Sequence, residues 1–380
     1  MLLTTHRYRQ TTGWDQPPDA GMDSAITLLI VFGASDSTRL TAGFTALRKA
    51  FVRSIWIGCS SSGEIYGHSL DDDTLVVAVM QFSATPLRLA TSAIESPEAS
   101  FDVGAGLGRQ LAAPDLKGVF VLSDGLSVNG TDLVKGLSEN LASGVVVTGG
   151  LAGDGDRFQN TWVLVNREPR AGQVTAVGLY GDHVQLAHGS KGGWDVLGPE
   201  REVTRARGNV LYTLDGQPAL ALYKQYLGDR AAGLPATGLL FPLAIRNDLV
   251  EDGHTVRTIL AVNEVENSIT FAGDIPQGSF VRLMRANFDR LIDGAADAAN
   301  SVDMQGYEEG RPVLGIGISC VGRRLVLGQR TEEEIDAVLD GLPPACKFIG
   351  YYSYGELSPL TSGRCDLHNQ TMTLSLFWES

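Results

Sequence analysis

The sequence predicts a mixed α/β protein in which strand–helix–strand units repeat, forming two related halves whose mixed sheets pack together with helices outside. Apolar runs rich in β-branched residues, such as 25–34, are typical of strands buried on both faces. A glycine turn also recurs along the chain. Segments 58–64 and 350–356 both read glycine, four residues, glycine and a carboxylate, and 148–154 is a weaker third copy. We call these three segments the acid turns; a glycine turn that follows a strand is a common place for a site.

The repeating unit is a strand, a helix, a second strand that runs into an acid turn, and then antiparallel strands. Capping residues and apolar positions at helical spacing predict the helices, as in 331–339, which Thr331 and Glu334 begin as a capping box. The predicted first strands are 25–34, 118–122 and 312–319, and the predicted acid-turn strands are 54–57, 145–147 and 347–349. We expect 74–82 and 87–94 to pair with each other as a hairpin.

Length and composition restrict the class of protein. A chain of 380 residues is too long for one ordinary domain. Its net charge of −14 argues against nucleic acid or an anionic membrane as a partner, and no apolar run is long enough to span a bilayer. The polar segment 1–23 lacks an export signal, and the four cysteines form no CxxC pair. We therefore expect a cytoplasmic protein with free thiols.

The motifs of common enzymes are absent. In the first acid turn, Cys59 stands where a G-x-S-x-G nucleophile elbow centred on Ser61 needs its first glycine. Segment 315–322 lacks the spacing of a dinucleotide-binding loop, and no Walker A lysine follows a glycine loop. These absences favour a binding module over an enzyme.

Reactive side chains are densest near the C-terminal acid turn, where neighbouring strands are predicted to end. An arginine, a carboxylate and tyrosines in one crevice suit an amino acid or another small zwitterion, because they can bind its carboxylate, its amine and its side chain. The candidate ligand-binding residues are Cys320, Arg323, Tyr352, Tyr354, Glu356, His368 and Asn369, together with the acids of the other two turns, Glu64 and Asp154.

Three alternatives stay open for the same residue types. Cys365, His368 and Cys320 can supply three metal ligands, although a single CxxH pattern lacks a fourth. Cys320 and His368 can also form a catalytic pair of a small-molecule enzyme. His188, in a glycine-rich segment, is the candidate axial ligand if the protein binds haem. We predict no cofactor, because polar residues surround both histidines.

The sequence resembles the FIST family of bacterial signal-transduction proteins, in which a FIST N-terminal domain precedes a FIST C-terminal domain. The resemblance extends over residues 24–378 and is strongest near the C-terminus. It is carried by IGCSSSGEI (57–65), VVTGGLAGDG (146–155), NVLYTLDGQPALALYKQYLG (209–228), FAGDIPQG (271–278), ISCVGRRLVLGQRTEEE (318–334), GYYSYGELSP (350–359) and CDLHNQTMTLSL (365–376).

The polar residues 1–23 are expected to form a lead-in. The resemblance implies a FIST N-terminal domain over 24–215 and a FIST C-terminal domain over 216–380. It implies an intracellular sensory module that binds a small ligand such as an amino acid and acts with a histidine kinase or a cyclic-dinucleotide enzyme. Some members of the family are proposed to be haem-binding nitric oxide sensors. We expect a non-enzymatic, ligand-binding sensor whose output partner is a separate protein, with the haem sensor as the alternative.

Overall fold

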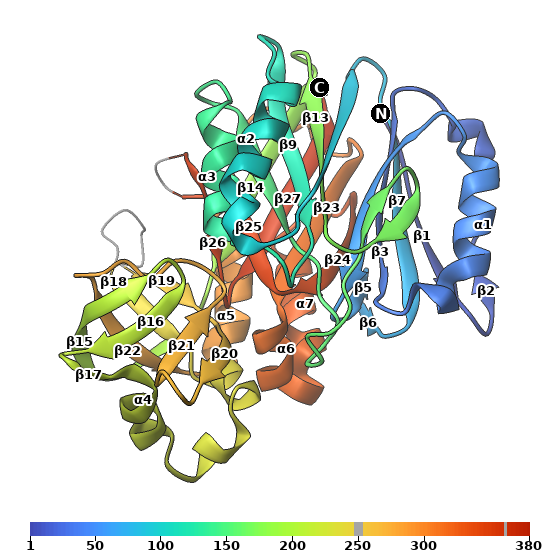
Figure 1. Ribbon diagram of the computed structural model, residues 1–380. Helices are drawn as coiled ribbons and strands as arrows, with labels where there is room; N and C mark the ends of the chain where they lie inside the picture. Colours follow the sequence, from blue (N-terminus) through green and yellow to red (C-terminus); the bar gives the residue numbers. More distant parts are fainter. Residues whose placement is uncertain (247–253, 361–362) are drawn as a thin grey trace.

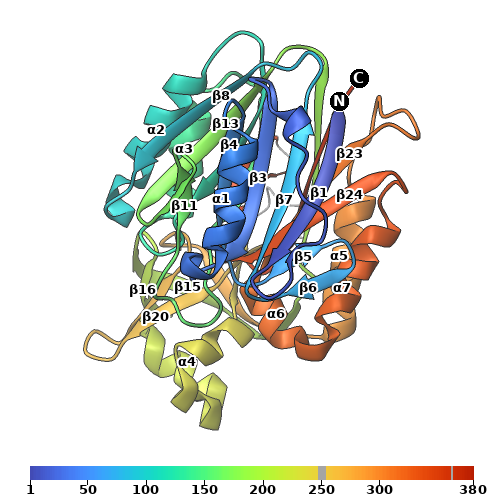
Figure 2. The same ribbon diagram turned by 90° about the vertical axis from the view of Figure 1, so that its right-hand side faces the viewer.

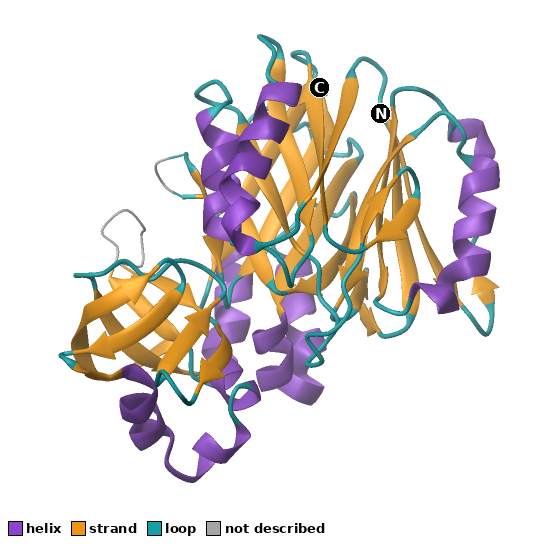
Figure 3. Cartoon of the chain, viewed as in Figure 1, coloured by secondary structure: helices purple, strands orange, loops and turns teal. Residues whose placement is uncertain are grey.

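The computed structural model describes residues 1–246, 254–360 and 363–380, which form a three-sheet body and a smaller β domain beside it (Figures 1 and 3). Helices cover the outer faces of the body, which confirms the predicted mixed α/β class. The helices are α1 (Thr41–Ala50), α2 (Ser100–Leu111), α3 (Gly130–Glu139), α4 (Ala219–Leu227), α5 (Phe288–Asn300), α6 (Val321–Leu327) and α7 (Thr331–Asp340).

The first sheet has the strand order β12-β11-β4-β3-β7-β1-β2, and helix α1 lies against its outer face (Figure 2). Strands β3 and β4 are parallel, and β7 returns antiparallel to β3. The strands are β1 (Leu2–Arg9), β2 (Gly13–Trp14), β3 (Thr27–Ala34), β4 (Ile55–Ser61), β7 (Thr74–Gln81), β11 (Val163–Val165) and β12 (Glu168–Arg170).

The second and third sheets repeat this connectivity. Each has a parallel pair, β9–β10 or β23–β24, and a return strand, β13 or β27, antiparallel to the first member of the pair. The second sheet runs β26-β25-β10-β9-β13-β8, with β8 (Leu87–Ala93), β9 (Leu116–Ser123), β10 (Val146–Leu151), β13 (Gln173–Tyr180), β25 (Gly355–Pro359) and β26 (Cys365–His368). The third runs β14-β27-β23-β24-β5-β6, with β5 (Glu64–Tyr66), β6 (Ser69–Asp71), β14 (Val184–Lys191), β23 (Val313–Cys320), β24 (Cys346–Ser353) and β27 (Met372–Glu379).

The sheets interlock because the hairpin that follows each acid turn joins a different sheet from the strand that precedes it. Hairpin β5–β6 pairs with β24, β25–β26 pairs with β10, and β11–β12 pairs with β4. The exchange is cyclic, so each sheet receives one hairpin and gives one. Strand β8 follows β7 of the first sheet along the chain, but it pairs with β13 of the second sheet. The predicted hairpin of 74–82 with 87–94 is therefore wrong, because β7 lies in the first sheet and β8 in the second.

The acid turns meet where the three sheets join. A glycine in each acid-turn strand lets it lie close to the parallel strand beside it, because a Cβ atom there would fall on a backbone carbonyl. That atom would lie 2.3 Å from Val31 O at Gly58, 1.8 Å from Val121 O at Gly149 and 2.1 Å from Gly317 O at Gly350. The amide four residues after each glycine donates to the carbonyl two residues after the glycine of another unit. These hydrogen bonds run from Ser62 N to Tyr352 O (2.8 Å), from Tyr354 N to Leu151 O (3.4 Å) and from Gly153 N to Ser60 O (3.1 Å).

This closed ring of three hydrogen bonds explains why the turn recurs in the sequence: it is the junction of the body. The core beneath it draws buried side chains from all three sheets, including Phe32, Phe120 and Ile316. Phe32 stacks on Tyr351 of the third sheet, with ring centroids 4.5 Å apart. Burial of such apolar area is the main stabilising term in folding.

The small β domain, residues 195–285, is inserted between β14 and α5 of the third unit. Its sheet runs β19-β18-β22-β15-β16-β21-β20. The two edge strands, β19 and β20, are consecutive in the sequence with Thr258 between them, so the sheet curls and brings its edges together. The strands are β15 (Asp195–Arg207), β16 (Val210–Leu214), β17 (Gln217–Pro218, paired with β16), β18 (Leu243–Arg246), β19 (His254–Arg257), β20 (Ile259–Asn263), β21 (Ser268–Phe271) and β22 (Phe280–Arg285). Figure 1 shows this domain at the lower left, next to α5 and β26.

Polar contacts fix the small β domain to the body. Fully buried Arg257 donates to Leu367 O at 2.9 Å, and Gln370 Nε2 donates to Leu239 O at 3.1 Å. Thr258 N donates to Asn369 Oδ1 at 3.3 Å. The segment 367–370 of the body therefore provides much of the surface on which the inserted domain rests.

Candidate functional site

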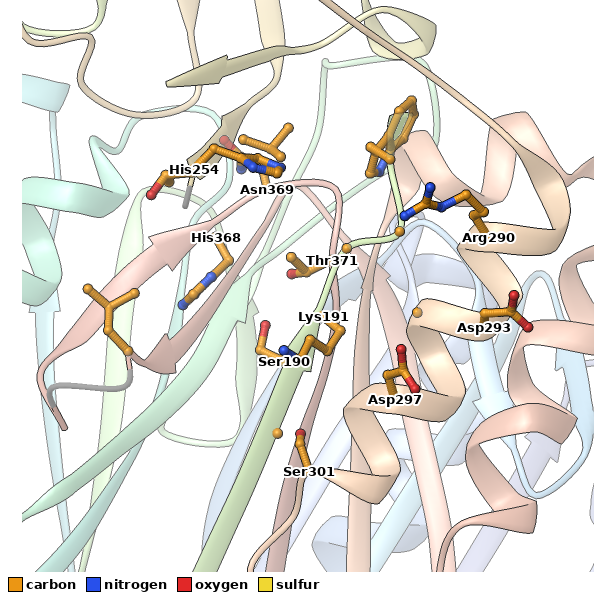
Figure 4. Close-up of a pocket in the computed structure, with 18 of the residues that line it drawn as sticks. Ser190, Lys191, His254, Arg290, Asp293, Asp297, Ser301, His368, Asn369 and Thr371 are labelled. Carbon is orange, nitrogen blue, oxygen red and sulfur yellow. The ribbon is translucent and has the colours of Figure 1, made fainter. Parts of the chain in front are cut away.

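A cavity of about 750 Å³ lies where the small β domain meets the body (Figure 4). Its walls are the end of β14, strand β19, helix α5 and the segments around β26. This volume lies within the range of small-molecule sites, and junctions between domains are a common place for them. The lining residues are His188 to Trp194, His254 to Val256, Arg290, Asp293, Gly294, Asp297, Ser301, Pro359, Leu360, His368, Asn369 and Thr371.

Glycines bring two walls of the cavity together. A Cβ atom at Gly189 would lie 2.1 Å from Ala298 O, and one at Gly193 would lie 2.0 Å from Arg290 O. Gly193 also has φ of +90°, a conformation that favours glycine. The glycine-rich segment around His188 is thus partly strand β14, and its glycines let it lie directly against α5.

The cavity carries charged groups of both signs. Asp293 and Asp297 lie one turn apart on α5 and both line the cavity; in Figure 4, Asp297 is the nearer to Ser190 and Lys191 of β14, and Asp293 extends away from them. Arg290, one turn before Asp293, forms an ion pair with Asp195 at 3.0 Å. Neither Asp293 nor Asp297 pairs with a cation in the described part of the chain. Two aspartates four residues apart on a helix repel each other, so a bound cation would be favourable there.

Histidines give the cavity neutral imidazole groups. Burial lowers the pKa of both His188 and His368, and the two rings interact electrostatically. His368 Nε2 lies 3.0 Å from Ser358 O. Because a carbonyl oxygen only accepts, Nε2 carries the proton and Nδ1 keeps its lone pair in the neutral ring.

Asn369 connects the cavity to the inserted domain. Its Oδ1 accepts from Thr258 N, since a backbone N–H only donates, and this places Nδ2 on the other side of the carboxamide. Nδ2 is buried and has no hydrogen-bond partner in the described part of the chain. A buried donor without an acceptor costs about 1–3 kcal/mol. Thr258 Oγ1 and Gln370 Oε1, next to Asn369, are also buried without a partner among the described residues.

The structure brings three of the ten predicted site residues into this cavity: His188, His368 and Asn369. The other seven are buried behind it or in the junction of the body. Glu64 and Glu356 are fully buried and equivalent. Each accepts from a serine hydroxyl three residues earlier and from the backbone and hydroxyl of a threonine at the start of the return strand. The partners are Ser61 and Thr74 for Glu64, and Ser353 and Thr371 for Glu356.

Burial dominates the titration of these two acids. It raises the pKa of Glu64 to about 7 and that of Glu356 to about 8, against the opposing effect of their hydrogen bonds. Because their partners come from the turn itself and from the return strand, the two carboxyl groups fasten each turn to its sheet. Glu356 reaches the cavity only through Thr371, whose hydroxyl donates to it at 2.9 Å.

Asp154 does not occupy the equivalent place, which corrects the expectation that all three acids coincide. It follows Gly149 by five residues, whereas Glu64 and Glu356 follow their strand glycines by six. By strand register, Val163 holds the position of the two glutamates. Asp154 instead accepts backbone hydrogen bonds from residues 158–160 and one from the Tyr354 hydroxyl, so it orders its own loop.

Arg323 and Tyr352 form a buried network with Glu334. Arg323 Nε lies 2.5 Å from Glu334 Oε1, and the Tyr352 hydroxyl donates to Glu334 Oε2 at 2.8 Å. Arg323 also donates to the carbonyls of Gly192, Gln370 and Leu291, which support the cavity walls. The crevice expected for Arg323 and Glu356 is therefore filled by protein, because Glu334 of α7 already supplies the anion for Arg323.

The remaining predicted residue, Cys320, ends β23 and is buried away from the cavity lining. Burial raises the pKa of its thiol, so the thiolate needed for attack or metal binding is disfavoured. Among the described residues, no group of three or more His, Cys, Asp or Glu side chains is placed to hold a metal ion. The cavity has imidazoles for a haem iron, but its walls carry aspartates, a lysine and hydroxyls where a porphyrin needs apolar faces, so the residues do not fit haem.

Sequence reasoning missed the acids of α5, Asp293 and Asp297, and the polar side chains of β14 beside His188. The available signal was weak. Both aspartates lie on the exposed face of helix α5, where charge is ordinary. Only the inserted domain turns that face into the wall of a cavity.

Comparisons with known proteins agree with the resemblance seen in the sequence. The FIST N domain model matches residues 27–217, and the FIST C domain model matches residues 219–359. No curated protein matches the chain. A solved structure, cyanuric acid hydrolase from A. caulinodans, is similar over 100% of this chain and 99% of its own, with 9% sequence identity and a TM-score of 0.38. No helix in the described residues has the length and apolar character to cross a membrane. The two family models together cover most of the chain, and the protein therefore belongs to the FIST family, whose domains are sensor modules of signal transduction.

Proposed function

We propose that the protein is a non-enzymatic sensor that binds a small, amino-acid-like molecule in the cavity between its body and its inserted β domain. The occupied state acts on a separate protein, such as a histidine kinase or a cyclic-dinucleotide enzyme, in the cytoplasm. One observation carries the proposal: a cavity of about 750 Å³ in which carboxylates, cations, imidazoles and hydroxyls surround the same space. Such a lining suits a zwitterion, because it offers partners for both of its charges.

The position of the cavity also suits a sensor. Its walls come from the body (β14, α5 and the β26–β27 segment) and from β19 of the inserted domain. A ligand that touches both parts favours the arrangement in which they lie together. Binding can change a population of states only by such a difference in affinity, so a site at the junction is well placed to produce a signal.

The chemistry of the lining supports binding over catalysis. The thiol of the predicted catalytic pair, Cys320, lies outside the lining, while His368 lies within it. His368 is held by a backbone carbonyl, an arrangement that fixes its tautomer and orients its free nitrogen. The Nδ1 atom of His368 can therefore accept a hydrogen bond from a ligand, a role in binding that needs no nucleophile.

A thermal-shift screen against amino acids, other small zwitterions and nucleotides tests the proposal. A ligand at 100 times its Kd stabilises the folded protein by about 2.7 kcal/mol, which raises its Tm by a few degrees. Ser190→Trp, which fills the cavity from β14, should abolish the shift. Gln185→Trp lies on the same strand outside the cavity lining and should retain it. A hit that binds Ser190→Trp as well as wild type would place the ligand elsewhere.

A further inference from the structure

We infer that the cavity binds a carboxylate group together with a proton. The proton is held by Glu356 behind the cavity wall, and a chain of hydroxyl groups connects it to the ligand at Ser190. The inference rests on the proposed function, because it places the carboxylate of a zwitterion in one part of the same cavity and makes its affinity depend on pH.

Three hydroxyl groups connect Glu356 to the cavity. The Thr371 hydroxyl lies 2.9 Å from Glu356 Oε2 and 3.2 Å from the Thr373 hydroxyl. The Thr373 hydroxyl in turn lies 2.9 Å from the Ser190 hydroxyl. Ser190 and Thr371 line the cavity, and Figure 4 shows their side chains in the middle of the lining, with His368 on one side and helix α5 on the other. Glu356 itself is fully buried, so these hydroxyls are its connection to a ligand.

The fold does not require this chain. In the first unit, the equivalent acid Glu64 accepts from the equivalent threonine, Thr74, in the same way. Two residues further along the return strand, on the same face, lies Val76, which belongs to the apolar core. The third unit has Thr373 at that position, opposite Ser190 of β14. The polar continuation is therefore specific to the unit that borders the cavity.

The direction of the hydroxyl chain depends on the charge of Glu356. A carboxylate only accepts, so with ionised Glu356 every hydroxyl points towards the acid, and Ser190 presents a lone pair to the cavity. A proton on Oε2 reverses the chain, because Thr371 then accepts and each hydroxyl donates to the next. Ser190 now points its O–H into the cavity, where it can donate to a carboxylate oxygen of a ligand.

Oε2 is the oxygen on which a proton leaves every hydroxyl a partner. Oε1 accepts from the Ser353 hydroxyl at 2.6 Å, and a proton there would leave that buried hydroxyl without an acceptor in the described part of the chain. Thr371, in contrast, has the Thr373 oxygen as its next acceptor. Because a buried donor without an acceptor is costly, the proton is favoured on Oε2.

Glu356 changes its charge in a pH range where its neighbours keep theirs. Burial raises its pKa to about 8, against the opposing effects of its hydrogen bonds and of the Arg323 charge. Burial also raises the pKa of Cys320 and of Tyr351 and lowers the pKa of His368, so all three are neutral near pH 8. The titratable groups around Glu356 are Arg323 of α6, Cys320 of β23, Tyr351 of β24 and His368 of β26, with His188 of β14 beyond His368.

Infrared spectroscopy of the full chain tests the hydroxyl chain, because a protonated carboxyl group absorbs apart from a carboxylate. The band that is lost in Glu356→Gln belongs to Glu356, and we expect its midpoint near pH 8. In Thr373→Val the midpoint should be about half a pH unit or more lower, since protonated Glu356 then leaves Thr371 without an acceptor. The band that is lost in Glu64→Gln should keep its midpoint in Thr373→Val. An unchanged midpoint for Glu356 overturns the inference.

Calorimetric titration with acetate, butyrate and N-acetylglycine tests the ligand end, because these carboxylates do not titrate between pH 7 and 9. We expect binding about tenfold weaker at pH 9 than at pH 7, as the protonated fraction of Glu356 falls. Glu356→Gln should remove this dependence, and Glu64→Gln, in the equivalent turn, should retain it. Ser190→Ala, which removes the donor, should weaken binding at pH 7 about tenfold or more.

The inference is also overturned if these carboxylates bind equally at pH 7 and 9, if Glu356→Gln keeps the dependence, or if none of them binds. These outcomes differ from failure of the proposed function. A compound of another class that is lost on Ser190→Trp would retain the sensor and its cavity while removing the site for a carboxylate and a proton. Absence of any compound that responds to Ser190→Trp would remove both.

Discussion

Replacing Arg323 with methionine removes the central member of the buried network behind the cavity. Arg323 and Glu334 are both completely buried and 2.5 Å apart. The guanidinium also donates to Leu291 O at 2.6 Å, to Gln370 O at 3.3 Å and to Gly192 O. Methionine has a similar length but offers no donor, so Glu334 keeps, among the residues that the structure describes, the hydroxyls of Ser319 and Tyr352 as donors.

Removing one partner of a buried ion pair costs about 3–5 kcal/mol, because the other charge stays buried without compensation. Unfolding entropy of about 2.1 cal/mol/K per residue gives about 0.8 kcal/mol/K for 380 residues. The expected loss of Tm for Arg323→Met is therefore about 4–6 °C. Because Gly192 lines the cavity, we also expect weaker ligand binding through displacement of its wall.

Urea denaturation and thermal unfolding followed by circular dichroism measure this loss. Arg39→Met is the matched control, because Arg39 pairs with Asp36 and their side chains are 47% and 52% exposed. A pair of this kind contributes about 1 kcal/mol or less. A loss for Arg323→Met no larger than that of Arg39→Met would refute the argument that burial makes the Arg323–Glu334 pair important.

Three further predictions concern single groups. Burial raises the pKa of Glu356 from 4.5 to about 8. Its contribution to the free energy of unfolding is therefore fully present below about pH 4.5 and is lost as the pH rises through 8. Glu356→Gln should flatten this pH dependence of stability in urea denaturation. Burial opposes the lowering of the pKa of Glu379, but hydrogen bonds from 83–85 outweigh it and bring the pKa to about 2. Glu379→Gln should therefore cost about 2 kcal/mol at pH 7, and its difference from wild type should shrink as pH falls from 4.5 towards 2. Purified protein mixed with haemin should show no stoichiometric Soret band. His368→Ala should lower thermal stability or small-ligand binding without changing any Soret signal. A stoichiometric Soret band that is lost on His188→Ala would instead establish the haem sensor.

The acid turns show how far local pattern reaches. Each acid-turn strand needs its glycine because a Cβ atom there would clash with a carbonyl of the neighbouring parallel strand. The same clash occurs in each repeat unit, so the glycine recurs in the sequence. The turns of Glu64 and Glu356 follow the same spacing and make the same contacts, but Asp154, one residue nearer its glycine, has different partners. The glycine pattern of the acid turns identified the repeat unit. The number of residues between the strand glycine and the acid decided which partners the acid binds.

The sequence by itself determined the class of fold, most of the strands and helices of the body, and the family. These properties depend on periodicity, turn chemistry and motifs that lie within short segments. The tertiary structure alone decided which sheet each hairpin joins and where the cavity lies. Asp297, Asn369 and His188 are far apart in sequence and meet only because a β domain is inserted between β14 and α5. No local pattern records that meeting: Arg323 looks like a ligand-binding arginine until Glu334 is seen to neutralise it, and the exposed Asp297 looks like an ordinary surface acid although it lines the cavity.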